Sequence, residues 1–400
     1  MADKPDAHSP VWSPWRVVVG FGLISLTADM VYEGARSMYG PLLASLGASA
    51  LVVGTIAGAG EAVALLLRIV SGPMADRTRR YWALTLTGYA LTAVCVPLLA
   101  VTPFLGGAGL AVAAALILLE RFGKAVRSPA KSALLADAAG QVGMGRGLGV
   151  HKALDQIGAF AGPLLVAACI ALAAGALWPG FAVLALPGAV SIVLLVITRS
   201  RAPQPDGAGQ VRVTERRTPL PPDFLRFAVG TALCTAGLVT FALISFHLVE
   251  RDLLRAAAIP LVYAAAMAAG AAAALVTGEL YDRLGGRVVL ALPLLVAAVP
   301  ALAFAGSLGL VITGVLMWGT AVGVQDSTVK ALVADLVPRD RRATAYGVFA
   351  GIQGAGALIG GIAAGALYEV STAALAIVTA AVQIVALALL ISVVRRHAKV

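Results

Sequence analysis

The chain has 400 residues, of which 60% are hydrophobic and only 12% are charged, and its formal net charge is +10. Soluble domains carry roughly 25% charged residues, so this composition excludes a soluble enzyme. The basic residues recur in the short gaps between apolar runs, a distribution that indicates membrane topology and argues against a nucleic-acid partner.

Apolar runs long enough to cross a membrane follow one another along the whole chain. A hydrocarbon layer of about 30 Å takes about 20 helical residues. We therefore predict an all-α membrane protein with twelve transmembrane helices at 15–43, 51–70, 82–102, 108–128, 147–173, 177–198, 224–248, 256–279, 287–305, 308–330, 344–368 and 371–394.

A polar stretch with five prolines, 199–223, divides these helices into six and six. Such a composition is typical of a flexible linker. We predict six-helix bundles at 15–198 and 224–396, a cytoplasmic linker between them, and short tails at 1–14 and 397–400. The first tail is polar, and we expect no cleaved signal peptide there.

Lysine and arginine residues predict the orientation. Alternate loops and the C-terminal tail contain Arg77, Arg79, Arg80, Arg146, Arg199, Arg217, Arg283, Arg287, Arg339, Arg341, Arg342, Arg395, Arg396 and Lys399. The opposite loops contain only Arg251 and Arg255. Because positive loops stay inside, we expect a multi-pass protein of the inner (plasma) membrane with both termini in the cytoplasm.

The two halves repeat each other. The segment Ala133 to Asp137 returns 198 positions later as Ala331 to Asp335, and the same offset relates Gly158 to Gly356 and Gly162 to Gly360. Parallel repeats of six helices with a substrate path between them are typical of rocking transporters. The repeat therefore predicts two pseudo-symmetric bundles.

The segment Gly72-Pro-Met-Ala-Asp76-Arg77-Thr-Arg79-Arg80 resembles the loop signature of the major facilitator superfamily. A second copy, Gly278-Glu-Leu-Tyr-Asp282-Arg283, stands where that family has one. A carboxylate at a helix end can pair with arginine across the halves. The resemblance thus implies a cytoplasmic gate formed by Gly72, Asp76, Arg77, Arg80, Asp282 and Arg283. The alternative is that these residues only fix topology and helix ends.

A second motif, Gly158-Ala-Phe-Ala-Gly162-Pro163, looks like the Gly-Pro motif of proton-coupled exporters in that superfamily. Leu164-Leu165-Val166 replaces the glycine pair that the full pattern has after the proline. The segment Glu120 to Pro129 resembles a bacterial subgroup with no assigned substrate. The resemblance of the glycine and proline motif, in the fifth predicted helix, favours export.

Ionisable residues inside transmembrane helices are costly and usually face a cavity or a partner. The proton-coupling candidates are Asp29, Glu33, Glu61, Glu120 and Asp155. The substrate-cavity candidates are Arg36, Arg121, Lys124, Arg127, His151, Gln325, Asp326 and Gln353. Asp29 and Glu61 are predicted to lie deepest, where desolvation favours the protonated acid.

The charges are unequally divided between the halves. At the positions that match Glu61 and Asp155, the second half has Met267 and Gln353. We therefore expect protonation in the first half, with shape and neutral contacts from the second. An alternative is that neighbouring residues form structural pairs, namely Glu33 with Arg36, Glu120 with Lys124, His151 with Asp155, and Asp326 with Lys330.

These patterns predict a secondary transporter working by alternating access, with proton-coupled export of a small organic solute or drug. Uptake or facilitated diffusion by the same fold is the first alternative. A non-transporting sensor or membrane enzyme is the second, although no metal-ligand or nucleophile–base pattern favours it. No Gly-x-x-x-x-Gly-Lys-Ser/Thr sequence is present, so we expect no ATP, no other cofactor and no metal. We expect a monomer whose partners are its substrate, protons and lipid.

Overall fold

The computed structural model describes residues 12–202, 220–338 and 341–397. Nearly all of the predicted tails and most of the predicted linker lie outside these ranges, as do Arg217, Arg339 and Lys399 of the charge pattern. The described residues form helices joined by short turns, and no strand occurs among them.

The first half consists of α1 to α9. Their bounds are α1 Pro14–Arg36, α2 Tyr39–Ser45, α3 Ala50–Leu66, α4 Arg68–Thr78, α5 Tyr81–Leu98, α6 Gly109–Val142, α7 Met144–Leu172, α8 Trp178–Ala182 and α9 Ala185–Arg201. Short 3-10 turns at Leu99–Phe104 and Gly106–Ala108 connect α5 to α6.

The second half consists of α10 to α17. Their bounds are α10 Pro222–Gly237, α11 Phe241–Glu250, α12 Ile259–Leu284, α13 Ala291–Ala303, α14 Leu308–Val324, α15 Lys330–Leu336, α16 Arg342–Val370 and α17 Thr372–His397. A π-helix, Gln325–Val329, joins α14 to α15.

These helices make twelve membrane crossings in the described chain, as predicted. Ten segments are long and apolar enough to cross a membrane, and one of them, Ala256–Ala303, contains both α12 and α13. The twelfth crossing is α6, which is longer than any other helix but carries charges in its middle, from Glu120 to Arg127. The prediction of an all-helical membrane protein is confirmed.

Two predicted helix ends were wrong. The helix predicted at 108–128 continues to Val142, because Pro129 removes only one helical hydrogen bond and the following residues are mostly good helix formers. The helix predicted at 308–330 likewise continues to Leu336, with the π-helix inside it. Both extensions project the chain beyond the predicted membrane span.

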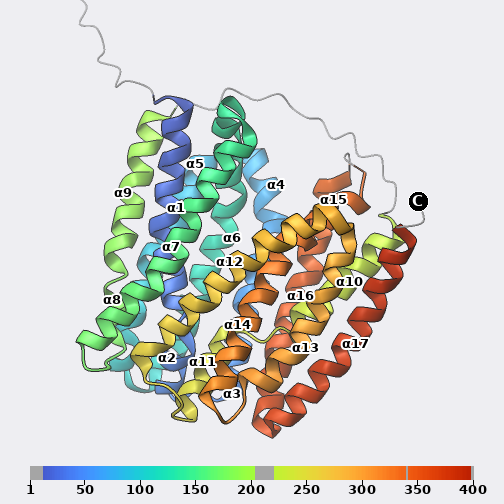
Figure 1. Ribbon diagram of the computed structural model, residues 1–400. Helices are drawn as coiled ribbons and strands as arrows, with labels where there is room; N and C mark the ends of the chain where they lie inside the picture. The colour runs from blue at the N-terminus through green and yellow to red at the C-terminus, as the bar shows by residue number, and fades with distance from the viewer. Residues whose placement is uncertain (1–11, 203–219, 339–340, 398–400) are drawn as a thin grey trace, which may run out of the picture.

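The helices form two bundles that lie side by side (Figure 1). Within the first, α1 packs on α7 and α5 on α6; within the second, α10 packs on α16 and α17, and α12 on α14. The main contacts between the bundles join α3 to α16, α2 to α11 and α7 to α12. The predicted pseudo-symmetric pair of bundles is therefore present.

The start of α1 and the end of α17 lie at one end of the molecule (Figure 1), which we call the terminal end. Arg396 near the end of α17 pairs with Asp223 at the start of α10 there, at 3.7 Å. The end formed by α2, α11 and the start of α3 is the opposite end. With an even number of crossings, the first helix must start and the last helix must finish at the same end, and this is observed for α1 and α17.

The bundles touch most closely at the opposite end. A Cβ atom on Gly40 of α2 would lie 2.1 Å from the carbonyl oxygen of Ala242 in α11, and one on Gly54 of α3 would lie 2.3 Å from that of Gly361 in α16. Glycine is therefore required for these approaches. At the terminal end, by contrast, a Cβ atom on Gly72 or Gly278 would have no neighbour within 4 Å.

Candidate functional site

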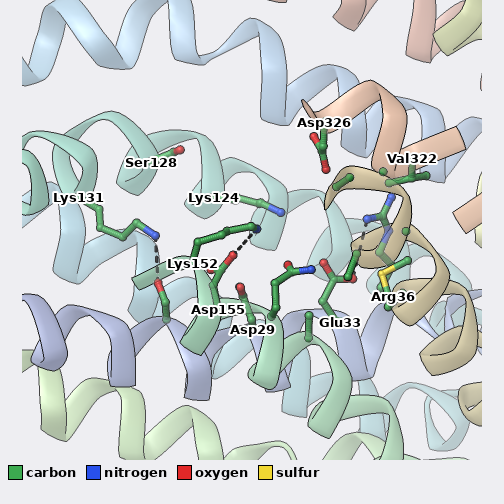
Figure 2. A pocket seen from close by; sticks show the side chains of 18 of the residues that line it. Asp29, Glu33, Arg36, Lys124, Ser128, Lys131, Lys152, Asp155, Val322 and Asp326 are labelled. Carbon is green, nitrogen blue, oxygen red and sulfur yellow. Dashed lines mark hydrogen bonds and ion pairs between the residues drawn. The ribbon is translucent and has the colours of Figure 1, made fainter. Parts of the chain in front are cut away.

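A polar cavity lies between the bundles, and its larger part, the first lobe, has a volume of about 310 Å³ (Figure 2). Its charged lining residues are Asp29, Glu33, Arg36, Lys124, Arg127, Lys131, Lys152, Asp155 and Asp326. All except Asp326 belong to the first half. The second half contributes mainly small or apolar residues, among them Met267, Gly270, Ala271 and Gly323.

A second lobe of about 260 Å³ shares Arg36, Val322 and Asp326 with the first. It adds Glu61 from α3 and Gln325 from the π-helix, with apolar residues such as Trp318. Arg36 therefore stands where the two lobes meet, and the predicted cavity residues Gln325 and Asp326 both line this space.

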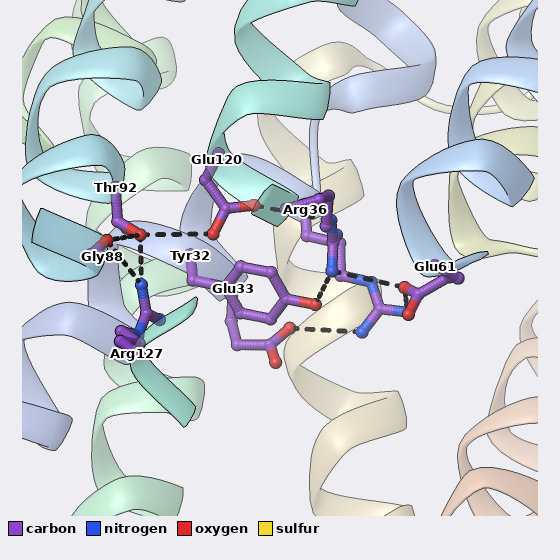
Figure 3. A network of polar contacts seen from close by, with 9 residues as sticks. Tyr32, Glu33, Arg36, Glu61, Gly88, Thr92, Glu120 and Arg127 are labelled. Atoms are coloured by element: carbon purple, nitrogen blue, oxygen red, sulfur yellow. Dashed lines mark hydrogen bonds and ion pairs between the residues drawn. The ribbon is translucent and has the colours of Figure 1, made fainter. Parts of the chain in front are cut away.

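Glu61 lies between two guanidinium groups (Figure 3). Its Oε1 accepts from Arg36 Nη2 at 2.9 Å and lies 3.4 Å from Arg121 Nη1. Arg121 is 4% exposed and also donates to the Tyr32 hydroxyl. Arg36 in turn lies 3.9 Å from Glu33 Oε2, so the predicted Glu33–Arg36 pair is present. Four candidates from three helices thus meet in one network.

Glu120 and Arg127 are held by Thr92 of α5 (Figure 3). Thr92 Oγ1 donates to Glu120 Oε1 at 3.4 Å and accepts from Arg127 Nη1. Glu120 is fully buried, and its other oxygen lies 3.4 Å from Arg121 Nε. The predicted Glu120–Lys124 pair does not form; Lys124 Nζ instead lies 3.5 Å from the centroid of the Tyr32 ring.

Asp29 and Asp155 form a carboxyl pair in the first lobe (Figure 2). Both side chains line this lobe next to each other, and Asp155 Oδ2 accepts from Lys152 Nζ at 2.6 Å. Asp29 comes from α1 and Asp155 from α7. Two of the five proton-coupling candidates, 126 positions apart in the chain, are therefore neighbours.

The glycine and proline motif of α7, Gly158 to Pro163, explains why these two acids meet. A Cβ atom on Gly158 would lie 2.1 Å from the carbonyl oxygen of Leu26, and one on Gly162 would lie 2.3 Å from that of Met30. Asp155, Gly158 and Gly162 share one face of α7 by their spacing of three and four. The two glycines thus let α7 approach α1 closely enough for its acid to reach Asp29. Pro163 follows inside the same helix.

His151 does not form the alternative pair with Asp155 among the described residues. Its Nε2 lies 3.0 Å from Ser25 Oγ and 3.4 Å from Lys131 Nζ. Lys131 also donates to Ser25 at 3.0 Å. His151 therefore belongs to a polar group at the edge of the first lobe, and it is 7% exposed.

The second half has a neutral pair where the first has two acids. Gly356 and Gly360 of α16 approach the backbone of Ala232 and Ala236 in α10, as Gly158 and Gly162 approach Leu26 and Met30 in the first half. This repeat sets Gln353 opposite Thr235 in the way that Asp155 is opposite Asp29. The Thr235 hydroxyl donates to Gln353 Oε1, and Gln353 Nε2 donates to Thr231 at 2.8 Å.

Among the described residues, the hydrogen bonds and ion pairs of the predicted gate residues lie within their own halves. Asp76 accepts a hydrogen bond from Tyr81 at 3.2 Å, and Arg283 pairs with Glu279 on its own helix. Arg77, Arg80 and Asp282 are exposed. In this conformation, the loop motif and its second copy are not joined across the bundles within the described residues.

The residues of the site that were not predicted include Tyr32, Thr92, Lys131, Lys152 and Tyr263. Lys131 was missed because the helix was predicted to end at 128; its spacing of seven from Lys124 would otherwise have placed it on the same face. Tyr263 of α12 is fully buried and donates to Glu33 of α1. Tyrosine and threonine in apolar helices carry no charge signal, so nothing in the sequence separated these three from core residues.

Two helical bundles around a shared charged cavity define a membrane transporter. The family model described as Major Facilitator Superfamily matches residues 21–253 and 231–400. The chain belongs to this superfamily, and the resemblance inferred from its loop motif is confirmed.

Relatives and solved structures agree with this assignment. The chain is 48% identical over 393 residues to an uncharacterized protein of Mycobacterium tuberculosis, covering 97% of this chain and 95% of the relative. It is 25% identical over 359 residues, 88% of each protein, to an uncharacterized MFS-type transporter of Methanocaldococcus jannaschii. The crystal structure of the peptide transporter POT in complex with sulfate matches with a TM-score of 0.76 at 16% identity over 99% of each chain. That last likeness shows the fold alone.

Proposed function

We propose that this transporter is coupled to protons and that the Asp29–Asp155 pair carries the proton. The observation that carries the proposal is that these two carboxyl groups lie next to each other in the lining of the first lobe. Two carboxylates in contact repel each other when both are ionised, so such a pair shares a proton. The absence of an ATP-binding sequence supports an ion gradient as the energy source.

Alternating access would couple substrate transport to the movement of this shared proton. The pair lies between the bundles, so rocking of the halves changes which side of the membrane reaches it. A group that binds a proton from one side and releases it to the other transfers the energy of the gradient. Asp155 is also bonded to Lys152, which gives the ionised state a partner after the proton leaves.

The neutral Thr235–Gln353 pair supports one proton site and not two. It occupies the equivalent position in the second half, where it can form the same kind of hydrogen bond without ionising. A proton site in only one bundle makes the two halves chemically different. We propose that the second half supplies shape and neutral contacts, as its small lining residues also suggest.

We assign Glu61 a different role from the one expected for a deep acid. Its contacts with Arg36 and Arg121 stabilise its ionised form. We propose that it serves as the counter-ion of these two arginines at the junction of the lobes. Glu33 and Glu120 also have arginine neighbours, and we propose structural roles for both.

We propose that the loop motif and its second copy form a gate in the conformation that is closed at the terminal end. We propose that the terminal end is cytoplasmic, from the basic residues gathered there, and that this conformation is open toward it. When the halves close at that end, Asp76 and Arg77 of the first copy and Asp282 and Arg283 of the second would approach each other. Their exposure here makes them available for such contacts.

A site of this kind can serve either export or uptake. Export in exchange for protons is favoured by the glycine and proline motif of α7. Uptake together with protons is favoured by the surplus of cationic side chains in the first lobe. Transport by vesicles of known orientation, with the proton gradient imposed in either sense, separates the two.

The experiment that tests the coupling compares Asp29→Asn and Asp155→Asn with the wild type in vesicles. We expect each change to abolish accumulation driven by a pH gradient while leaving equilibrative exchange of substrate. Asp137→Asn, which removes an exposed acid on α6, serves as the control and should keep full coupling. Gradient-driven accumulation at the wild-type level in both site variants would refute the proposal.

A further inference from the structure

Three cations on one face of α6 line the first lobe without a carboxylate partner. Lys124, Arg127 and Lys131 are spaced three and four residues apart, so they follow one side of the helix. The ion pairs within the cavity's described residues use Arg36, Arg121 and Lys152 instead. We call these three residues the α6 cation stripe.

Neutral groups hold the stripe in place. Lys124 Nζ lies 3.5 Å from the centroid of the Tyr32 ring, and the Arg127 guanidinium carbon lies 4.6 Å from that of Tyr89. A ring face attracts a cation but does not neutralise its charge. Lys131 donates to the Ser25 hydroxyl at 3.0 Å. The stripe therefore has no neutralising carboxylate contact among the described residues.

The Arg127 guanidinium has N–H donors that form no hydrogen bond among the described residues. It is 5% exposed, and both of its hydrogen bonds, to Gly88 O and Thr92 Oγ1, come from Nη1. A guanidinium has five N–H donors, so those on Nη2 and Nε are left for a ligand. A charged group buried in this way ordinarily has a counter-charge, and none lies within ion-pair distance here in the described residues.

The wall that faces the stripe leaves room for a ligand. It is built from Gly270, Ala271, Ala274 and Gly323, with Asp326 as its one charged residue among those described. The cations of the first lobe, five in all, are Arg36, Lys124, Arg127, Lys131 and Lys152, against the four acids Asp29, Glu33, Asp155 and Asp326. If the Asp29–Asp155 pair shares a proton, the surplus of positive charge grows further.

We infer that the transported solute carries an anionic group, a carboxylate or a phosphate, which binds to the α6 cation stripe. The inference rests on the proposed function only in taking this cavity as the substrate path. A lobe of about 310 Å³ suits a small organic molecule. Charge-assisted bonds from Arg127 and the two lysines would supply both the counter-charge and the orientation.

Binding of an anion to the α6 cation stripe is thermodynamically linked to protonation of the Asp29–Asp155 pair. Protonation of the Asp29–Asp155 pair removes a negative charge near the stripe, so it strengthens anion binding, and bound anion strengthens protonation in return. This reciprocity favours transport of the two together. The other charged and titratable groups near the pair are Glu33 on α1, the stripe on α6, His151 and Lys152 on α7, and Asp326 in the π-helix.

The test measures thermal stabilisation of the purified protein in detergent at fixed pH and ionic strength. The probes are three anions with their neutral counterparts: benzoate and benzamide, succinate and succinamide, glycerol 3-phosphate and glycerol. We expect at least one anion to raise Tm where its neutral counterpart does not. The double variant Lys124→Gln/Lys131→Gln should need at least about ten-fold more of that anion for the same shift.

Two further variants control for folding and for general charge. Lys124→Arg/Lys131→Arg keeps both charges and should keep the anion response, whereas Arg226→Gln removes a cation that pairs with Asp223 outside the cavity and should also keep it. Equal stabilisation by neutral counterparts, an unchanged response in the glutamine double variant, or no response to any of the three anions would overturn the inference. Because this binding assay needs no proton gradient, failure of proton coupling alone would leave its result intact.

Discussion

Tyr263 of α12 donates a hydrogen bond to Glu33 of α1 across the boundary between the two bundles. Both residues lie toward the opposite end, where Gly40 and Gly54 also bring the bundles together. Glu33 is one turn from Asp29 and beside Arg36. The bond therefore links the closed end of the cavity to the charged network inside it.

Removing this bond should favour opening at the opposite end. A hydrogen bond to a charged group contributes about 1.5–3 kcal/mol, so Tyr263→Phe should shift the balance of the two states by up to that amount. Spin-label distances across α2 and α11 would show a larger open population. Tyr281→Phe breaks a similar bond, to Asp335 within the second half, and should leave those distances unchanged.

The approach of α7 to α1 should be intolerant of any side chain at Gly158. In Gly158→Ala, the added Cβ would lie 2.1 Å from the Leu26 carbonyl oxygen, and overpacking of this kind costs about 1–3 kcal/mol. Gly149→Ala on the same helix meets no atom within 4 Å and should be neutral or stabilising by about 1 kcal/mol. Thermal unfolding in detergent compares the two. Equal stability of both variants would show that the contact does not position the Asp29–Asp155 pair.

The Glu61 contacts should behave as one network. In a double-mutant cycle with Arg36→Gln and Glu61→Gln, we expect a coupling energy of about 1–3 kcal/mol, because the two residues are in direct contact within one network. Glu61→Gln should still permit accumulation driven by a pH gradient, since we propose a counter-ion role for Glu61. Complete loss of coupling in that variant, with normal exchange, would move the proton site from Asp29 and Asp155 to Glu61.

The neutral pair of the second half should matter for stability and not for coupling. Gln353→Leu removes the bonds with Thr231 and Thr235, and each such bond contributes about 0.5–1.5 kcal/mol. Accumulation driven by a proton gradient should persist in this variant. Loss of that accumulation alongside an unaltered Tm would mean that the second half takes part in proton transfer.

Most of the fold could be predicted from the sequence, because apolar length, the 198-residue repeat and the basic loops each constrain it independently. The break between α3 and α4 at Leu67 and the π-helix at Gln325 could not, since neither residue type disfavours an ordinary helix. The extension of α6 past Pro129 was missed because a proline within a helix looks the same in sequence as one that ends it.

The charged residues of the site could be predicted from the sequence, but their interaction partners could not. Asp29, Glu61 and Asp155 stand out as acids in apolar helices, so their presence in the cavity region could be expected. Their partners depend on helix rotation and on contacts between distant segments, and these decide that Glu61 meets Arg36 while Asp155 meets Asp29. Same-helix spacing gave the Glu33–Arg36 pair but failed for Glu120 and His151, whose partners are Arg121 and Ser25.

The central claim is that two bundles rock around a proton-binding pair, and paired spin-label distances test it most directly. One label pair, at Thr78 and Leu284, reports on the terminal end, and a second, at Ser45 and Arg251, reports on the opposite end, after replacement of Cys95, Cys169 and Cys234. On acidification, we predict that the two distances change in opposite senses, and that Asp29→Asn/Asp155→Asn abolishes this response. Distances that stay fixed, move in the same sense, or respond equally in the double variant would contradict the account.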